Sequence, residues 1–178
     1  MKTGAPRFIL LSALLVAFLF PGWATAQTAS PATVSPLAEQ HYKQGMLALQ
    51  KGDLRTAIRE FRLAVRYAPK LPTAHNSLGY AFLQNGQIDA AVTEFRKAIA
   101  LGPTFTEAYL NMARALERRN DLDGAIQFCQ YALRQRPDWA NAHYQLGLAL
   151  RAKGCHAEAS AEFEKARELD PRLRPPRD

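Results

Sequence analysis

The chain has 178 residues, of which 48 % are hydrophobic and 22 % are charged. These proportions are ordinary for a soluble globular protein, and the length favours about one domain. The formal net charge is +7, but no run of like charge is long enough to form a nucleic-acid-binding arm. Nucleic acid is therefore not an expected partner.

Residues 1–26 have the pattern of a secretory signal peptide. Lys2 and Arg7 precede an almost entirely apolar stretch at residues 8–20, and the small-residue triplet Ala24–Ala26 follows. At about 1.5 Å per residue this stretch is shorter than the ~30 Å hydrocarbon core of a bilayer, which disfavours a spanning helix. The pattern predicts cleavage after the triplet and an exported protein, periplasmic or secreted. An uncleaved membrane anchor is the alternative.

Two further segments lack an apolar period. Residues 27–37 are rich in Ser, Thr, Ala and Pro, and this composition predicts a flexible linker. Residues 172–178 contain Arg172, Arg174 and Arg177, and they predict a solvated, disordered basic tail. Contact of this tail with anionic lipid or nucleic acid is the alternative interpretation.

Between these segments the sequence repeats itself every 34 residues without a gap. The units are residues 38–71, 72–105, 106–139 and 140–171. A small residue, two alanines and a proline recur in all four units, and a phenylalanine recurs in three. These columns are Gly45, Gly79, Ala113 and Gly147; Ala57, Ala91, Ala125 and Ala159; Ala64, Ala98, Ala132 and Ala166; Pro69, Pro103, Pro137 and Pro171; and Phe61, Phe95 and Phe163, with Cys129 in the third unit.

The columns resemble the tetratricopeptide-repeat (TPR) family. The second unit carries the family's pattern at His75, Leu78, Gly79, Phe82, Ala91, Phe95, Ala98 and Pro103. The resemblance covers about three-quarters of the chain. It implies an all-α, right-handed solenoid of four helix-turn-helix repeats, whose first helices line a concave groove for partner peptides or helices.

Elementary helix chemistry independently favours two helices per unit. Gly52, Gly86, Asn120 and Gly154 separate the two apolar-periodic stretches of each unit, and such residues tolerate the positive φ of a tight turn. The proline near the end of each unit stops the second helix. Gln44 in the first unit, and Ser160 and Arg167 in the last, replace apolar residues of the inner units. These polar residues suit the outer faces of a four-repeat array.

Three of the four histidines, His41, His75 and His143, share one repeat position. A shared metal site is one interpretation, but equivalent residues of stacked repeats lie on the order of 10 Å apart, whereas zinc holds its ligands at ~2 Å. We therefore expect these rings to pack as aromatic side chains do, as Tyr109 does at this position in the third unit. No metal or other cofactor is expected.

The remaining reactive residues do not converge on a catalytic pattern. Cys129 takes the aromatic position of the third unit, about 12 Å along the helix axis from the position of Cys155, so we expect two free thiols, the first buried and the second exposed. Asp121 and Asp123 lie at an expected helix start, where carboxylates cap the backbone. No phosphate-binding glycine loop, nucleophile elbow or zinc-protease motif occurs, so an enzyme is not expected.

The clearest functional signal is an apolar stripe on the first helices of the first, second and fourth units, opposite the expected core. A helix whose outer side faces only water should be polar there. The predicted partner-binding groove consists of Tyr42, Met46, Leu49, Asn76, Tyr80, Leu83, Leu110, Arg114, Tyr144, Leu148 and Arg151. An alternative is that some of these residues only pack between adjacent first helices.

The sequence therefore predicts an exported adaptor or scaffold that binds a protein or peptide partner in its groove. The alternative is a structural module that stacks on itself within a cell-envelope complex. Contact with a membrane is expected only through an uncleaved signal segment. Tyr42 and Met46 stand where the chaperone-binding members of the family have the Lys and Asn that clamp a terminal carboxylate, so that ligand class is not expected.

Overall fold

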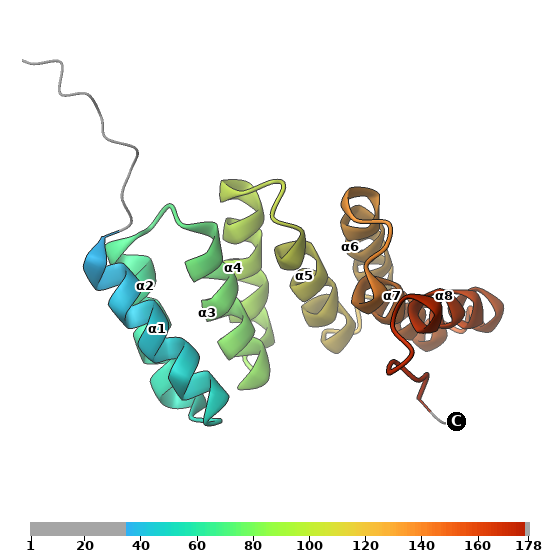
Figure 1. Ribbon diagram of the computed structural model, residues 1–178, viewed down its shortest axis with the longest axis horizontal. Helices are drawn as coiled ribbons and strands as arrows, with labels where there is room; N and C mark the ends of the chain where they lie inside the picture. Colours follow the sequence, from blue (N-terminus) through green and yellow to red (C-terminus); the bar gives the residue numbers. More distant parts are fainter. Residues whose placement is uncertain (1–34, 177–178) are drawn as a thin grey trace, which may run out of the picture. The chain divides into compact units, whose positions relative to one another are not determined.

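A computed structural model describes residues 35–176, which form eight α-helices and no strand (Figure 1). The predicted signal peptide and all but the last residues of the predicted linker lie outside the described residues. No helix within 35–176 is long and apolar enough to cross a membrane. The helices are α1 (Pro36–Gln50), α2 (Leu54–Tyr67), α3 (Pro72–Gln84), α4 (Ile88–Leu101), α5 (Thr106–Arg118), α6 (Leu122–Gln135), α7 (Ala140–Ala152) and α8 (His156–Leu169).

The helices pair as α1–α2, α3–α4, α5–α6 and α7–α8, and each pair stacks on the next (Figure 1). This arrangement confirms the predicted all-α solenoid. Adjacent first helices also meet, α3 with α5 and α5 with α7, and these contacts exceed those between second helices. The array therefore curves with its first helices inside, and we call the surface of α1, α3, α5 and α7 the inner face.

The turn inside each hairpin has the predicted backbone. Gly52, Gly86 and Gly154 have φ values of 76°, 77° and 88°, and Asn120 has a φ of 64°. Asp121 caps α6 by accepting a hydrogen bond from the backbone N–H of Gly124 at 3.1 Å, as predicted. The four turns therefore reverse the chain within a few residues and hold each hairpin closed.

The two helices of a hairpin touch where a glycine of the first meets a phenylalanine of the second. A Cβ added to Gly45, Gly79 or Gly147 would lie only 2.7 Å from a ring carbon of Phe61, Phe95 or Phe163, respectively. Real Cβ atoms do not approach so closely, so these glycines set the distance between the helices. The third hairpin has Ala113 and Cys129 instead, both with 0 % exposure.

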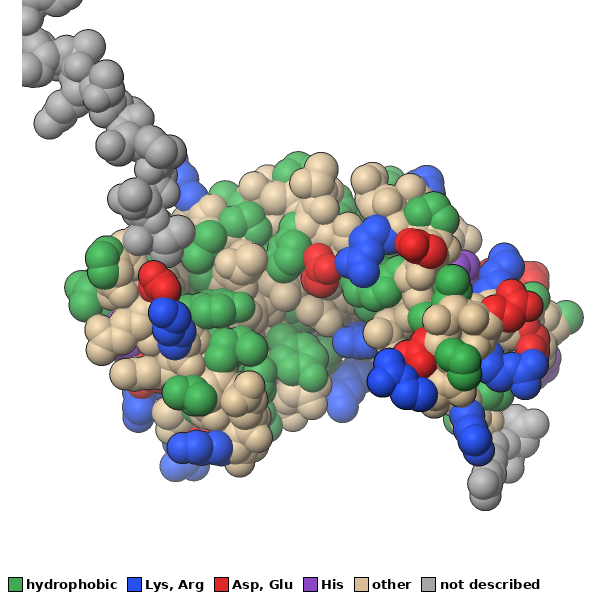
Figure 2. Space-filling model, in the orientation of Figure 1, with side chains coloured by type: hydrophobic (Ala, Val, Ile, Leu, Met, Phe, Trp, Pro, Cys, Tyr) green, Lys and Arg blue, Asp and Glu red, His purple; other side chains and the backbone are tan. Residues whose placement is uncertain are grey.

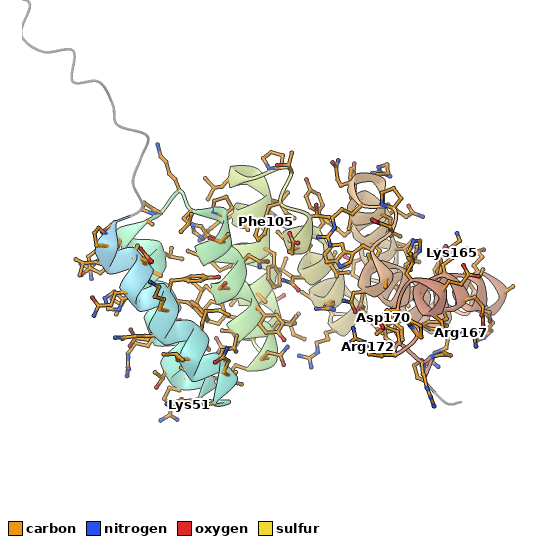
Figure 3. All side chains as sticks on the ribbon, in the orientation of Figure 1. Lys51, Phe105, Lys165, Arg167, Asp170 and Arg172 are labelled. Atoms are coloured by element: carbon orange, nitrogen blue, oxygen red, sulfur yellow. The ribbon has the colours of Figure 1, made fainter. Side chains whose placement is uncertain are left out.

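Both ends of the array differ in detail from the predicted boundaries. α1 begins at Pro36, inside the predicted linker, because a proline suits the first helical turn. After α8 the chain turns back: the Arg172 side chain donates to Asp170 at 2.9 Å, and Arg151 on α7 donates to the carbonyl of Pro176 at 3.1 Å. Figure 3 shows Asp170 and Arg172 at this turn. Residues 172–176, for which a disordered tail was predicted, thus lie against the last hairpin.

Candidate partner-binding surface

Most of the predicted groove residues are half-buried on the inner face, so each presents part of its side chain to solvent. The half-buried members are Tyr42, Met46, Leu49, Asn76, Tyr80, Arg114, Tyr144, Leu148 and Arg151. In the view of Figure 2, hydrophobic side chains gather over α1 and α3, and charged side chains gather over α7 and α8. On the inner face the predicted positions of α1 and α3 are mostly apolar, whereas α5 and α7 combine Arg114 and Arg151 with Tyr144 and Leu148.

Two predicted groove residues belong to the core instead. Leu83 is 2 % exposed and Leu110 is 3 % exposed. The guanidinium of Arg118 reaches from α5 to the backbone carbonyl of Leu83 at 2.6 Å, so the next first helix covers this leucine. Leu110 lies in one buried cluster with Leu146 of α7. A pattern read from each helix alone overestimates the exposure of these two leucines, because adjacent first helices approach closely enough to enclose them. Leu83 still contributes to the lining of a hollow on the inner face.

The apolar half of the face is held in place by the core beneath it. The ring of Tyr42 packs at 5.7 Å from that of Phe61, and its hydroxyl accepts a hydrogen bond from the Ser77 side chain at 3.2 Å. At the other end of the array, Tyr144 lies 5.5 Å from Phe163. The rings of Tyr42 and Tyr144 therefore pack against the second helix of their own hairpin. Both remain half-exposed, so part of each ring can contact a ligand.

The charged half begins at a hollow of about 460 Å³ between α3, α5 and α7, lined by Tyr80, Leu83, Gln84, Arg114, Glu117, Arg118 and Gln145. Arg114 donates to the side-chain oxygens of Asn111 and Gln145, each at 3.4 Å. Gln145 in turn donates to the carboxylate of Glu117. These bonds fix the side chains that surround the hollow.

Glu117 is the acid of this region, and its environment is unusual. Burial raises the pKa of its carboxyl above the usual range, and the hydrogen bond from Gln145 together with the positive charges of Arg114, Arg118 and Arg151 partly opposes that rise. Among the residues that line the hollow, two arginines, Arg114 and Arg118, accompany this one carboxyl group. The hollow keeps an excess of positive charge, which suits an acidic group of a ligand.

Hydrogen bonds join neighbouring first helices, and the sequence pattern did not predict them. They involve one repeat position, which is occupied by Ser77, Asn111 and Gln145. Ser77 bonds Tyr42 at 3.2 Å, and Asn111 donates to Asn76 at 3.0 Å. The polar column was visible in the sequence, but its contact with the previous repeat depends on the curvature of the array. These bonds fix the spacing of the first helices, and hence the inner face.

Family models described as tetratricopeptide repeats match residues 42–104, 82–153 and 140–173. The chain belongs to the TPR family. No curated protein matches it.

Solved structures with the same fold include two MamA proteins. A MamA crystal structure has 26 % sequence identity and a TM-score of 0.68, covering 76 % of this chain and 79 % of that one. The 41-end form of MamA from Desulfovibrio magneticus RS-1 has 24 % identity and a TM-score of 0.70, covering 78 % of each chain. YrrB, described as a TPR protein with an unusual peptide-binding site, has 24 % identity and a TM-score of 0.66, covering 75 % of this chain and 69 % of that one. At identities below 25 % the likeness shows the fold alone.

The histidines of this TPR array each pair with a glutamate of the same hairpin. The Nδ1 atom of His75 lies 2.7 Å from Glu94, and its Nε2 atom lies 2.9 Å from the carbonyl oxygen of Pro69. His143 makes the same two contacts, with Glu162 at 2.6 Å and Pro137 at 2.8 Å. Both ring nitrogens of each histidine therefore lie within hydrogen-bonding distance of an oxygen atom. The rings are buried as predicted, but they are hydrogen-bonded within the hairpin rather than packed as plain aromatic groups.

His41 pairs similarly with Glu60 at 2.8 Å, while its ring stacks on Tyr67 with 5.5 Å between centroids. The periodic pattern did not predict these three histidine–glutamate pairs, because each glutamate lies 19 residues from its histidine, on the other helix of the hairpin. Within residues 35–176 no group of three potential metal ligands forms.

The two cysteines are free thiols in different surroundings. Cys155 is half-buried at the start of α8, whereas Cys129 is buried. Burial raises the pKa of the Cys129 thiol to about 12. Because the thiolate is the reactive form, this cysteine behaves as a small apolar core residue of the TPR array.

Proposed function

We propose that the inner face binds a segment of a partner protein, so that the TPR array acts as an adaptor. The observation that carries this proposal is that an apolar surface and a positively charged hollow adjoin on the inner face. Rigid, half-buried aromatic and aliphatic side chains, with Tyr80 among them, border a hollow with excess positive charge. Anchored aromatic rings beside charged groups are typical of protein-binding surfaces, where a few desolvated residues carry most of the affinity.

The chemistry of the two halves defines the ligand. Apolar side chains of the partner would cover Tyr42, Met46 and Tyr80 on α1 and α3. An acidic side chain further along would enter the hollow near Arg114 and Arg118. Such a ligand spans successive first helices, as a peptide or helix lying across the array does. YrrB, which shares the fold, is described as a TPR protein with an unusual peptide-binding site, and this supports a peptide or protein ligand in general.

The proposal is tested by capturing partners from a cell-envelope extract with the purified protein and then measuring affinity for the captured segment. Tyr80→Ala should weaken binding by about 2 kcal/mol, roughly thirtyfold, with an unchanged far-ultraviolet circular dichroism spectrum. Arg96→Ala, an exposed residue of α4, is the control and should bind normally. Normal binding by folded Tyr80→Ala would exclude the inner face, and unfolding of this variant would show that the ring is a core residue.

We also propose that the protein acts after export, in the periplasm or outside the cell. The support is the sequence of residues 1–26, with Lys2 and Arg7 before an apolar stretch and a small-residue triplet at its end. The mass of the protein recovered from the envelope fraction should correspond to a chain beginning at Gln27. Recovery of the intact chain there would indicate an uncleaved anchor instead.

Stacking of one array on another is the second candidate function, and one observation favours it. Leu47 on α1 is 55 % exposed, whereas the alanines at its position in the later repeats are fully buried against the preceding hairpin. These alanines are Ala81, Ala115 and Ala149. An exposed leucine at a stacking position suits contact with another array. Sedimentation velocity over a range of concentrations tests this candidate, and a constant monomer would exclude it.

A further inference from the structure

A second charged surface lies on α2, away from the inner face. Arg55, Arg59, Arg62 and Arg66 are all exposed, and their spacing of four, three and four residues places them on one side of the helix, over about 16 Å. We call this set the arginine stripe. It borders a hollow of about 750 Å³, to which Ile58, Leu63, Asn85 and Gln87 also contribute. None of these residues belongs to the inner-face hollow.

The packing of the repeats does not require arginines at these positions. The equivalent positions hold Asp89, Thr93, Arg96 and Ala100 on α4; Asp123, Gln127, Gln130 and Arg134 on α6; and Ala157, Ala161, Glu164 and Glu168 on α8. No other second helix has more than one arginine there, and α8 has two acids. The same hairpin thus forms with neutral, acidic or basic residues at this surface, and the stripe needs another explanation.

The surroundings of the stripe leave most of its charge uncompensated. Arg59 shares Glu60 with His41, at 3.0 Å and 2.8 Å respectively. Arg62 lies over the ring of Phe82, 5.3 Å from its centroid. Arg55 and Arg66 form no ion pair with any residue between 35 and 176, although Asp53 at the start of α2 interacts electrostatically with Arg55 and Arg59. Two acids, Asp53 and Glu60, thus accompany four arginines, which leaves an excess of positive charge. Like charges one turn apart destabilise a helix, so the stripe weakens α2 unless an anion binds.

We propose that the arginine stripe binds an acidic helical segment of a partner protein. Carboxylates spaced at i, i+4, i+7 and i+11 on that helix would face the four guanidiniums, which bind carboxylates in a two-pronged geometry. An apolar side chain between them would contact Leu63, which is half-buried beside the hollow, whereas Ile58 is only 7 % exposed. A flat membrane would touch only the guanidiniums at the rim and would leave this apolar surface uncovered. A groove-bound partner and an acidic helix could therefore occupy the array together.

The probe is a synthetic, fluorescently labelled helical peptide with glutamates at the spacing of the stripe and leucines between them. Its matched control has glutamine in place of each glutamate. Fluorescence anisotropy should show binding of the glutamate peptide that weakens with added salt. The double variant Arg55→Gln/Arg66→Gln should lose on the order of tenfold in affinity. This variant keeps the contacts of Arg59 and Arg62, and circular dichroism should confirm its fold.

Two controls separate this surface from general charge and from the inner face. Arg96→Gln/Arg134→Gln removes the same charge from the equivalent positions of α4 and α6 and should bind the peptide like the wild type. Tyr80→Ala should also leave peptide binding unchanged, whatever its effect on the inner face. Equal binding of the glutamate and glutamine peptides, or equal losses in the two double variants, would overturn the proposal. Binding to phosphatidylglycerol vesicles without binding to the peptide would assign the stripe to a membrane and would also overturn it.

Discussion

The third repeat builds the same hairpin as the other three repeats from different side chains. Where the others place a glycine against a phenylalanine, the third places Ala113 against Cys129, both fully buried. The glycines elsewhere cannot accept a Cβ, because it would lie 2.7 Å from the ring. A methyl group on the first helix is therefore compatible with a smaller side chain on the second.

The polar pair of the hairpin changes in the same repeat. The other repeats bury a histidine against a glutamate, while the third has Tyr109 and Phe128, with ring centroids 6.2 Å apart. The tyrosine hydroxyl donates to the carbonyl of Pro103 at 2.9 Å, in the place where His75 meets Pro69. In both repeats a side chain of the first helix is hydrogen-bonded to the proline carbonyl, but the third repeat has no carboxylate beside it.

This comparison teaches that the repeat positions change in pairs across the hairpin. One pair is set by volume, because a core tolerates changes that keep its total volume. The other is set by hydrogen bonding and charge, because a buried charge needs its partner, whereas two apolar residues can replace both. Exchanging the pairs between repeats tests both statements.

Breaking the buried ion pair of the second repeat should have the largest effect. Glu94→Ala removes the carboxylate that lies 2.7 Å from both His75 and Lys97. It leaves the buried His75 ring without its hydrogen-bond partner and removes the partner of Lys97, and breaking a buried pair in this way costs up to about 3–5 kcal/mol in the free energy of unfolding. Urea denaturation followed by circular dichroism measures this loss. Phe128→Ala, at the equivalent position of the third repeat, leaves no charge unpaired and serves as the comparison.

Transplanting the pair of the third repeat should recover most of that loss. His75→Tyr/Glu94→Phe reproduces Tyr109 and Phe128, and the new hydroxyl would meet the Pro69 carbonyl. We expect the free energy of unfolding to lie within about 1.5 kcal/mol of the wild-type value. A double variant as unstable as Glu94→Ala would show that the two pairs are not interchangeable.

The volume pair should give an intermediate effect. Cys129→Phe places a ring against the Cβ of Ala113, which the other repeats avoid, and overpacking of this kind costs about 1–3 kcal/mol. Adding Ala113→Gly restores the pair found elsewhere and should recover the loss, apart from about 0.5–1 kcal/mol for a glycine within a helix. Urea denaturation of the single and double variants measures the coupling. A more stable Cys129→Phe single variant would contradict the argument.

The sequence predicted the fold because every structural requirement recurs at a fixed interval. Small residues opposite a phenylalanine, turn residues with positive φ, and a terminal proline repeat every 34 residues, so the hairpins could be placed before any contact was known. The inner face was predicted only in part. A single-helix pattern places Tyr80 and Arg114 on one side of successive first helices, where they line a common hollow, but it cannot show that Leu83 and Leu110 are almost fully buried.

The contacts that the sequence analysis missed join side chains on different helices. The pairing of His75 with Glu94, and of Asn111 with Asn76, needs the distance between helices, which no periodic pattern contains. A signal for the first pair was present, because both columns change together in the third repeat. The spacing of the four arginines along α2 is likewise visible in the sequence. The hollow beside them is not, because the α3–α4 turn of the next repeat forms part of its wall.

The buried thiol of Cys129, in the third repeat, should be unreactive while the protein is folded. Burial raises the pKa of Cys129 to about 12, so its thiolate is scarce near neutral pH, whereas Cys155 is half-exposed. A disulfide exchange reagent at about pH 8 should modify one thiol quickly and the other only after urea unfolds the array. Cys155→Ser should abolish the fast phase. Fast modification that survives in Cys155→Ser would show that the core of the third hairpin opens readily.

The smallest expected effect is a decrease in the stabilising contribution of Glu60 at acid pH. The first repeat has this carboxyl group, whereas the third has Phe128 at the equivalent position. The hydrogen bond from His41, with help from Arg59, holds the pKa of Glu60 below its usual range. A carboxyl with a depressed folded-state pKa stabilises the fold above its unfolded value of about 4.3, and this contribution disappears as the pH falls through the folded-state pKa. Wild type should therefore be more stable than Glu60→Gln near pH 6, and the difference should shrink towards about pH 3.5. Phe128→Leu, which changes the equivalent position without a carboxylate, should show a difference from wild type that stays constant over the same range. A constant difference for Glu60→Gln as well would mean that the His41–Glu60 contact contributes through packing alone.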